Sequence, residues 1–245
     1  MVACESGRVS LSGKQSLMTK PSSSSPPSRD EFIDLIKDAG SSDEVFFGYP
    51  VKEDGLYLQQ DPKEFADLCH FLAHDVKRAE LSLDLGIASG GQTKFIRDWL
   101  DTPKSIILDD GNHEMFPHWA RIKPTVRTDI VCEIIEDSHK PSVREQLMQF
   151  KDQVDLAYVD GDHSYHGLKQ DIFLMKHVLK EGGLMILHDT TAVWDCKMVF
   201  DDLLRSGEFH LFRNFENRFG ISVWIRKGRH RKPKWYNHAY GWGKI

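Results

Sequence analysis

Short apolar runs alternate with amphipathic segments along most of this chain. Leu156–Val159 and Leu184–Leu187 each stand between turn-forming residues, and an uninterrupted apolar run of this kind is typical of a strand that is buried on both faces. Segments with apolar residues three and four positions apart lie between such runs and predict helices. The pattern predicts strands over 81–85, 105–108, 131–135, 156–159, 184–188, about 209–213 and 220–225, and helices over 93–100, 142–150, 165–180 and 196–205.

This alternation predicts an α/β protein. A strand, a helix and a second strand in succession form a right-handed unit of a parallel sheet, and helices then cover both faces of that sheet. The last two predicted strands have no helix between them, and Asn214–Arg218 supplies turn residues, so we expect a hairpin there. Ahead of the sheet, Asp61 followed by Pro62 is typical of a helix start with Asp61 as the N-cap.

The two ends of the chain differ in composition from its middle. Residues 1–28 contain a Ser- and Pro-rich run and few large apolar groups, which predicts a disordered extension. Residues 29–80 are expected to form an N-terminal cover segment, and residues 81–226 the core. Residues 227–245 form a basic tail with aromatic side chains. That tail could bind nucleic acid, or it could be solvated and dock its aromatic groups on its own domain or a partner subunit. We favour the second interpretation because the chain as a whole is acidic, with a net charge of −5.

Composition excludes several classes of protein. The sequence pI of about 6.2 gives no general signature for nucleic acid or an anionic membrane. No stretch approaches the length of apolar residues that a membrane span requires, and the N-terminus lacks the apolar region of a signal peptide. The 4 cysteines have no CxxC spacing, so we expect neither a zinc site nor a disulfide framework. We therefore expect a cytoplasmic protein with reduced thiols.

A glycine-rich turn follows the first predicted strand and leads into a helix. The segment Leu81–Thr93 contains glycines that let the backbone approach a ligand closely. It is neither the G-x-G-x-x-G motif nor a phosphate-binding loop with Gly-Lys-Ser/Thr. The second strand ends at Asp109, with Asp110 next to it, and one carboxylate there can accept hydrogen bonds from two ribose hydroxyls. We choose Asp109 for this role and keep Asp110 as the alternative.

Two acidic stretches follow the fourth and fifth predicted strands. These are Asp160–His163 and His188–Thr191. Polar groups at the carboxyl ends of neighbouring buried strands point into the ligand crevice of an open α/β sheet. Two carboxylates there can hold a Mg²⁺-like ion, and an imidazole can take a proton at neutral pH. The other histidines, including His70, His74 and His113, are expected to be ordinary surface or core residues.

The motifs resemble those of class I S-adenosylmethionine-dependent methyltransferases. The strand that ends in the glycine turn matches the first motif of that family. Asp160-Gly161-Asp162-His163 and the His188-Asp189 pair resemble a narrower group, the cephalosporin-biosynthesis and macrolide-sugar O-methyltransferases. The more distant catechol and caffeoyl-coenzyme-A O-methyltransferases have Asp-Asn-Thr where this chain has Asp189-Thr190-Thr191. The resemblance covers roughly residues 50–226.

The resemblance implies a Rossmann-like, doubly wound sheet of seven strands in the order 3-2-1-4-5-7-6, with an N-terminal helical cover. It implies S-adenosylmethionine and a divalent cation, Mg²⁺ first, as cofactors. It implies O-methylation of a small hydroxylated acceptor, a sugar or a phenol of secondary metabolism. The implied ligands are Asp160, Asp189 and His188 for the metal, with His163 as general base beside Asp160. The implied cofactor contacts are Asp84, Gly86, Ala88, Gly90, Gln92, Thr93, Asp109, Asp110, Asp137, Ser138 and Asp160.

Two departures from the family patterns leave alternatives open. The cephalosporin-type pattern has Glu-Asp where this chain has His188-Asp189, and the catechol-type pattern has Asn in place of Thr190. Since a hard cation prefers oxygen ligands, His188 could instead be a second base, a support for the ligands, or a ligand of a softer metal. The rival functions are a metal-independent N- or O-methyltransferase that uses His163 or His188, and a non-catalytic nucleoside-binding scaffold. We expect neither a membrane nor a nucleic-acid partner, and a homo-oligomer is an open alternative.

Overall fold

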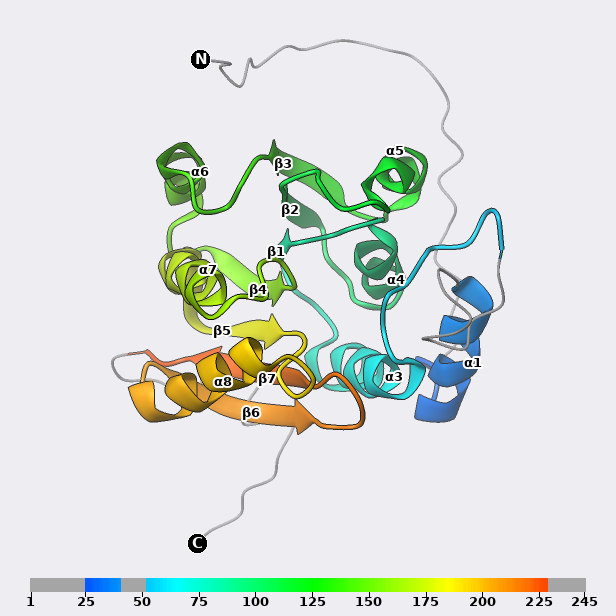
Figure 1. The fold of residues 1–245 in the computed structure, drawn as a ribbon. Helices are drawn as coiled ribbons and strands as arrows, with labels where there is room; N and C mark the ends of the chain where they lie inside the picture. Colours follow the sequence, from blue (N-terminus) through cyan, green and yellow to red (C-terminus); the bar gives the residue numbers. More distant parts are fainter. Residues whose placement is uncertain (1–24, 41–51, 229–245) are drawn as a thin grey trace, which may run out of the picture.

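The computed structural model describes residues 25–40 and 52–228. Its sheet has 7 strands in the order β3-β2-β1-β4-β5-β7-β6 (Figure 1), which confirms the expected topology. Strands β1 to β5 run parallel where they pair, while β7 pairs antiparallel with both β5 and β6, as the expected hairpin requires. The strands are β1 (Leu81–Leu85), β2 (Lys104–Asp109), β3 (Asp129–Ile135), β4 (Val154–Val159), β5 (Leu179–Leu187), β6 (Phe209–Phe215) and β7 (Ile221–Arg226).

Helices cover both faces of the sheet, as the alternation of the sequence predicts. Apolar side chains of α6, α7 and α8 pack on one face, and those of α1, α3 and α4 pack on the other (Figure 1). The helices are α1 (Arg29–Ala39), α3 (Pro62–Phe71), α4 (Gly91–Trp99), α5 (Trp119–Ile122), α6 (Pro141–Leu147), α7 (Tyr165–Val178) and α8 (Trp194–Ser206). Short turns of 3₁₀ helix flank α5 at Phe116–His118 and Lys123–Thr125 and extend α6 over Met148–Phe150, and a π-helical turn, Leu72–Val76, extends α3.

The helix starts depend on capping side chains. Asp61 caps α3 as expected, because its Oδ1 accepts hydrogen bonds from the backbone N–H groups of Lys63 and Glu64 at 3.0 Å each. The start of α7 is also capped by a side chain. Ser164 is the N-cap and accepts a hydrogen bond from the N–H of Gly167, while the Asp162 carboxylate accepts one from the N–H of Ser164.

Strand β5 is longer than the apolar run predicted. It begins at Leu179, which pairs with Val154 of β4, so α7 ends at Val178 rather than at residue 180. The segment that contains α5 was not predicted, because only a few of its side chains are apolar. Two of these, Trp119 and Ile122, form a small buried cluster with Ile87 and Ile107.

Two of the predicted segments lie largely outside the described residues. These are the N-terminal extension, apart from residues 25–28, and the basic tail from residue 229 onward. The described part of the N-terminal cover packs on the core through α1 and α3. None of the described helices has the length and apolar character that a membrane crossing would need.

Candidate active site

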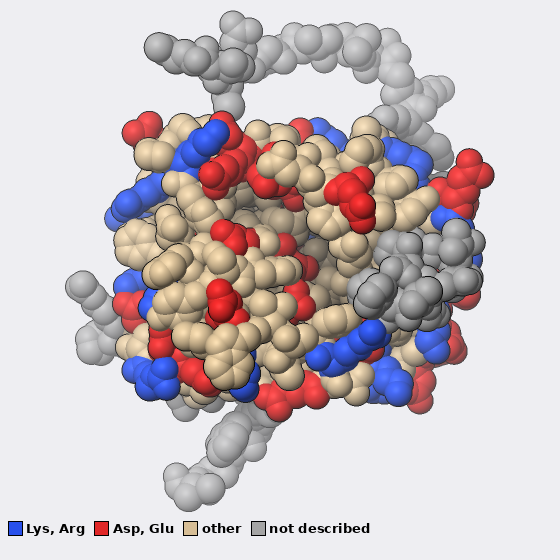
Figure 2. All heavy atoms as spheres, in the orientation of Figure 1, with Lys and Arg blue, Asp and Glu red and all other residues tan. Residues whose placement is uncertain are grey.

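Two adjoining cavities lie at the carboxyl ends of the parallel strands. The larger, of about 560 Å³, is lined by the loops that follow β1, β2, β3 and β4. The smaller, of about 400 Å³, is bounded in addition by Tyr57–Gln60 of the N-terminal cover and by the loop after β5. Figure 2 shows this face hollowed, with acidic side chains gathered in and around the hollow. The residues that line both cavities are Gly86, Ala88, His113, Asp160 and Gly161.

The glycine turn after β1 shapes the wall between the cavities. Gly86 has a positive φ of 75°, and a Cβ atom there would lie 2.1 Å from the carbonyl oxygen of Asp160. Only glycine permits this approach of two strand ends. Gly90 also has a positive φ, of 79°, but it packs against the ring of Trp119. Gly86 and Ala88 therefore line the larger cavity as expected, whereas Gly90 does not.

Asp109 organises the same turn. Its Oδ2 accepts hydrogen bonds from the N–H groups of Ile87 at 2.7 Å and Ala88 at 3.3 Å, and its Oδ1 accepts one from Gly111 at 2.7 Å. A carboxylate offers about four lone-pair sites, so Asp109 keeps about one for a ligand. Asp110 also lines the larger cavity, is exposed, and among the described residues accepts hydrogen bonds only from Asn112.

Three further expected cofactor residues, besides Gly90, do not line the larger cavity. The Asp84 side chain is 1% exposed and forms an ion pair with Arg97, with 2.5 Å between Oδ2 and Nη2. Thr93 is fully buried and lines neither cavity. Gln92 lines the smaller cavity. Buried charges are rarely left without a partner; the partner of Asp84 is Arg97 of α4, and Asp84 lines neither cavity.

The loop after β3 contributes Asp137 and Ser138 to the lining of the larger cavity. Asp137 is exposed and accepts a hydrogen bond from the N–H of His139. Ser138 donates a hydrogen bond of 2.6 Å to Asp171 of α7, and Nε2 of His139 lies 3.3 Å from the same carboxylate. Asp171 is fully buried. Asp171 thus holds the loop after β3 in place through its contacts with Ser138 and His139. No local sequence pattern indicates this role.

Burial raises the pKa of Asp171 to about 6. A carboxyl group whose pKa is higher in the folded state stabilises the fold below the unfolded pKa, and this contribution is lost as the pH rises through about 6. The side chain in Asp171→Asn stays neutral at every pH. We therefore expect the free energy of unfolding of this variant, relative to that of the wild type, to increase by on the order of 3 kcal/mol as the pH rises from about 4 to about 7. Thermal unfolding of both proteins across this range measures the effect. A melting-temperature difference that is independent of pH would contradict it.

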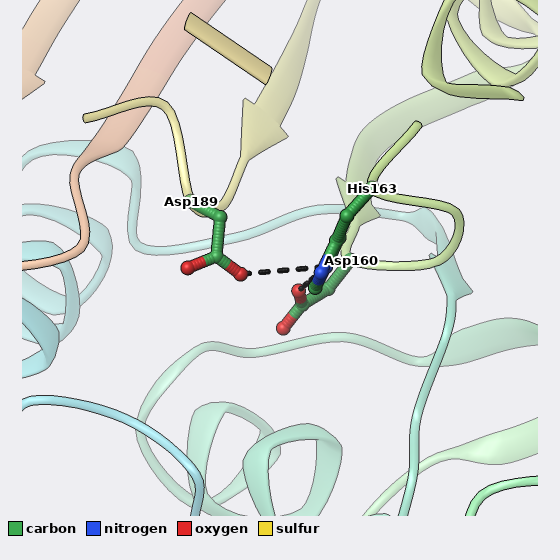
Figure 3. A group of neighbouring side chains, drawn as sticks. All are labelled: Asp160, His163 and Asp189. Atoms are coloured by element: carbon green, nitrogen blue, oxygen red, sulfur yellow. Dashed lines mark hydrogen bonds and ion pairs between the residues drawn. The ribbon is translucent and has the colours of Figure 1, made fainter. Parts of the chain in front are cut away.

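Asp160, His163 and Asp189 point toward one another at the floor of the smaller cavity (Figure 3). Asp160 and His163 come from the loop after β4, and Asp189 comes from the loop after β5. Nε2 of His163 lies 3.3 Å from Oδ1 of Asp160 and 3.3 Å from Oδ2 of Asp189. One donor atom from each residue lies within 4.8 Å of the others, a separation that one metal ion can bridge.

His188 also contacts both carboxylates. Its Nδ1 lies 2.9 Å from Asp189 Oδ2 and 3.3 Å from Asp160 Oδ1. The ring is buried, and its Nε2 has no hydrogen-bond partner among the described residues. The group of donor atoms that could hold an ion therefore contains His163 in place of His188. The buried His188 contacts the carboxylates of Asp160 and Asp189 through its Nδ1 atom.

The two imidazoles and two carboxylates perturb one another strongly. Burial alone raises the pKa of Asp160, but the charge of His188 and the hydrogen bonds from His163 and His188 outweigh it and hold the pKa well below its usual range. The hydrogen bond to Asp160 raises the pKa of His163. Burial lowers the pKa of His188, but the charge of Asp160 more than compensates and keeps it well above the usual value. Such shifts are typical of functional sites.

Sequence reasoning missed several residues of the smaller cavity. Gln60, which is 2% exposed, lies with its Nε2 3.4 Å from Oδ2 of Asp160 and accepts a hydrogen bond of 3.2 Å from the hydroxyl of Tyr158. His113, expected to be an ordinary residue, lines both cavities. Tyr57 and Phe219 supply aromatic walls. The irregular, aromatic segment Gly55–Gln60 ahead of the first strand is a signal for Tyr57 and Gln60, whereas no local pattern indicates His113 or Phe219.

A family model described as a methyltransferase domain matches residues 71–190. No curated protein sequence matches this chain. A protein from Pyrococcus horikoshii described as an RNA methyltransferase is similar in structure, with a TM-score of 0.54, 10% identity, and coverage of 83% of this chain and 98% of that one. The fibrillarin pre-rRNA processing protein of Methanococcus jannaschii has a TM-score of 0.50, 17% identity, and coverage of 63% and 70%.

A third solved structure is the O-methyltransferase of tomaymycin synthesis from Streptomyces achromogenes, in complex with S-adenosylmethionine. It has a TM-score of 0.48, 13% identity, and coverage of 81% of this chain and 91% of that one. At such low identities these likenesses concern the fold, while the family model concerns the segment from the end of α3 to the end of β5.

Proposed function

Because this chain belongs to the class I S-adenosylmethionine-dependent methyltransferases, we propose that it transfers a methyl group to a hydroxyl of a small metabolite. The acceptor is a sugar or a phenol, and a divalent cation assists the transfer. The observation that carries this proposal is the position of Asp160. It lines both cavities and belongs to the carboxylate–imidazole cluster. A methyl donor in the larger cavity and an acceptor in the smaller one would meet beside this cluster.

The larger cavity suits a nucleoside. Asp109 or Asp110 would bind the ribose hydroxyls, and the loop that contains Asp137 and Ser138 would lie beside the adenine. Gly86 and Ala88 would lie close to the donor, because their backbone forms the cavity wall. These assignments follow the positions of the residues around the cavity and the family resemblance.

The cluster suits a divalent cation bound mainly by oxygen. We assign Asp160 and Asp189 as its protein ligands, and Mg²⁺ as the first candidate, because hard cations prefer carboxylate oxygen. A bound cation would lower the pKa of an acceptor hydroxyl. His188 would orient the carboxylates. The side chain of His163 is 45% exposed and lies beside both carboxylates, and it would take the proton of the acceptor hydroxyl.

The reaction is an in-line displacement on the methyl carbon of a sulfonium. The acceptor oxygen forms a bond to the methyl group while the carbon–sulfur bond breaks, and the electron pair of that bond stays on sulfur. The positively charged sulfonium of S-adenosylmethionine thereby becomes the neutral thioether of S-adenosylhomocysteine. The proton of the acceptor hydroxyl passes to His163. The walls formed by Tyr57 and Phe219 would hold the acceptor and exclude water.

The lining of the cavities also bears on the class of acceptor. Neither cavity is lined by a lysine or arginine of the described chain. Phosphate groups are usually bound by such residues, so this supports a small uncharged acceptor over nucleic acid. Residues 229–245, which include most of the basic tail, lie outside the described part of the chain.

Metal removal tests the proposal. We expect EDTA to abolish production of S-adenosylhomocysteine from S-adenosylmethionine and a panel of catechols, other phenols and sugars, with at least a hundredfold loss because general acid–base and metal assistance typically contribute about 10²-fold or more. Added Mg²⁺ should restore the activity. The measurement is product formation by mass spectrometry.

Activity that is indifferent to EDTA would instead favour the metal-independent alternative. That alternative has its own support, because both imidazoles contact Asp160 and Asp189 directly. A scaffold without turnover would bind S-adenosylmethionine in calorimetry and give no S-adenosylhomocysteine with any acceptor of the panel.

A further inference from the structure

A buried carboxylate of the N-terminal cover binds the turn between β6 and β7. Glu64 of α3 is fully buried. Its oxygens accept hydrogen bonds from three successive backbone N–H groups, those of Arg218, Phe219 and Gly220, the last two at 3.0 Å. Beside it, Oδ1 of Asp61 accepts a hydrogen bond of 3.0 Å from the side chain of Asn217. We call residues 217–220 the hairpin turn.

The hairpin turn also binds the segment that follows Asp189 through backbone hydrogen bonds. The carbonyl oxygen of Phe219 accepts hydrogen bonds from Thr191 at 2.8 Å and Ala192 at 3.0 Å, and that of Gly220 accepts one from Thr190 at 3.2 Å. Gly220 has a φ of 88°, and a Cβ atom there would lie 2.3 Å from Oγ1 of Thr191. The contact between the two segments is therefore close and leaves little freedom of movement.

This turn also reaches the smaller cavity. Phe219 lines it, with its ring centroid 6.0 Å from that of His188. Asp189, at the start of the held segment, has a positive φ of 60°, which is uncommon for a residue other than glycine. A backbone in this conformation needs support from its surroundings. The hydrogen bonds of the next three residues to the hairpin turn supply that support.

We propose that Glu64 is a positioning residue of the active site, which sets Asp189 and Phe219 through the hairpin turn. The link to catalysis rests on the proposed function, whereas the mechanical link from Glu64 to the segment after Asp189 does not. Glu64→Gln is the direct test, because the amide keeps the size of the side chain but replaces one accepting oxygen by an N–H donor. At least one of the three N–H groups then loses its partner.

Amide hydrogen exchange of the full chain measures the mechanical link. We expect Glu64→Gln to speed exchange about tenfold or more in peptides that cover 189–193 and 217–221, with little change in β1 and β2. Glu145→Gln, at an exposed position of α6, is the matched control and should change neither peptide. Unchanged exchange at 189–193 in Glu64→Gln would overturn the proposal.

A milder variant guards against a general loss of folding. Asn217→Ala removes the hydrogen bond between Asp61 and the hairpin turn and leaves the Glu64 carboxylate in place. It should increase exchange in the same two peptides by a smaller factor. An increase spread over the whole chain in both variants would show that these residues support the fold in general, and would overturn the positioning role.

Binding of Mn²⁺, followed by its electron paramagnetic resonance signal, tests the link to the site. In Glu64→Gln we expect Mn²⁺ affinity to fall about tenfold, while affinity for S-adenosylhomocysteine stays within about twofold, because Asp189 shifts and the larger cavity does not. Local exchange that rises without loss of Mn²⁺ affinity would overturn the link to Asp189. Absence of Mn²⁺ binding in the wild type would count against the metal assignment of the proposed function, and the exchange result would then decide the positioning role by itself.

Discussion

Asp160→Asn is expected to lower the rate of methyl transfer about 10³-fold, within the range that metal and acid–base assistance supply. The substitution keeps the shape of the side chain and removes the charge that both imidazoles contact at 3.3 Å. An amide has one accepting oxygen instead of two and binds a hard cation poorly. The proton acceptor and the cation site are therefore impaired together.

The affinity for S-adenosylmethionine should change little in Asp160→Asn, by no more than about threefold, because the other walls of the larger cavity are untouched. Calorimetry measures this affinity, and product formation with the acceptor found for the wild type measures the rate. Asp34→Asn, at an exposed position of α1, is the matched control. Full turnover in Asp160→Asn would remove the cluster from the mechanism.

Asp109→Ala is expected to act in the opposite way, with its main effect on the cofactor. Loss of the carboxylate leaves the N–H groups of Ile87, Ala88 and Gly111 without their acceptor, and it removes the proposed ribose contact. Hydrogen bonds to a charged group contribute about 1.5–3 kcal/mol each. We expect the dissociation constant of S-adenosylmethionine to rise about 30-fold or more, which corresponds to about 2 kcal/mol.

Asp110→Ala is the informative comparison for Asp109→Ala. Asp110 lines the same cavity but contacts only Asn112 among the described residues, so it has no part in shaping the glycine turn. A larger loss of affinity in Asp110→Ala than in Asp109→Ala would transfer the ribose role to Asp110. Equal affinity for the cofactor in Asp109→Ala and the wild type would contradict both roles of Asp109.

Local patterns predicted an α/β protein with a parallel sheet, and the family resemblance supplied the order of its strands. The apolar runs in β4 and at the end of β5 are recognisable because a strand covered on both faces needs uninterrupted apolar residues. The start of α3 was equally clear, since Asp61 and Pro62 act on backbone groups within the next few residues. The limits of β5 were less clear, because Gly182 and Gly183 are typical of a turn, although they lie within β5 where its register with β4 is irregular.

The candidate site was predicted in outline and corrected in detail. Asp109, Asp137, Asp160 and Asp189 follow strand ends, and the parallel sheet gathers such ends at one edge. Asp84 also lies on a strand, but Arg97 from the following helix reaches it and forms an ion pair. The choice between a ligand and a buried partner depends on which way the side chain points, and that depends on packing.

The sequence by itself determined the order of the strands' motifs and the acidic and imidazole groups that meet at their ends, because these depend on residues close together in the chain. Only the tertiary structure placed one donor atom each of Asp160, His163 and Asp189 within 4.8 Å of one another. It also decided that Gln60 contacts Asp160 and that Glu64 binds the hairpin turn, across separations of 100 and 154 to 156 residues. Contacts of this kind form when segments pack against one another, and no spacing within either segment encodes them. The packing of these segments thus brings the acidic stretches Asp160–His163 and His188–Thr191 together in one candidate site.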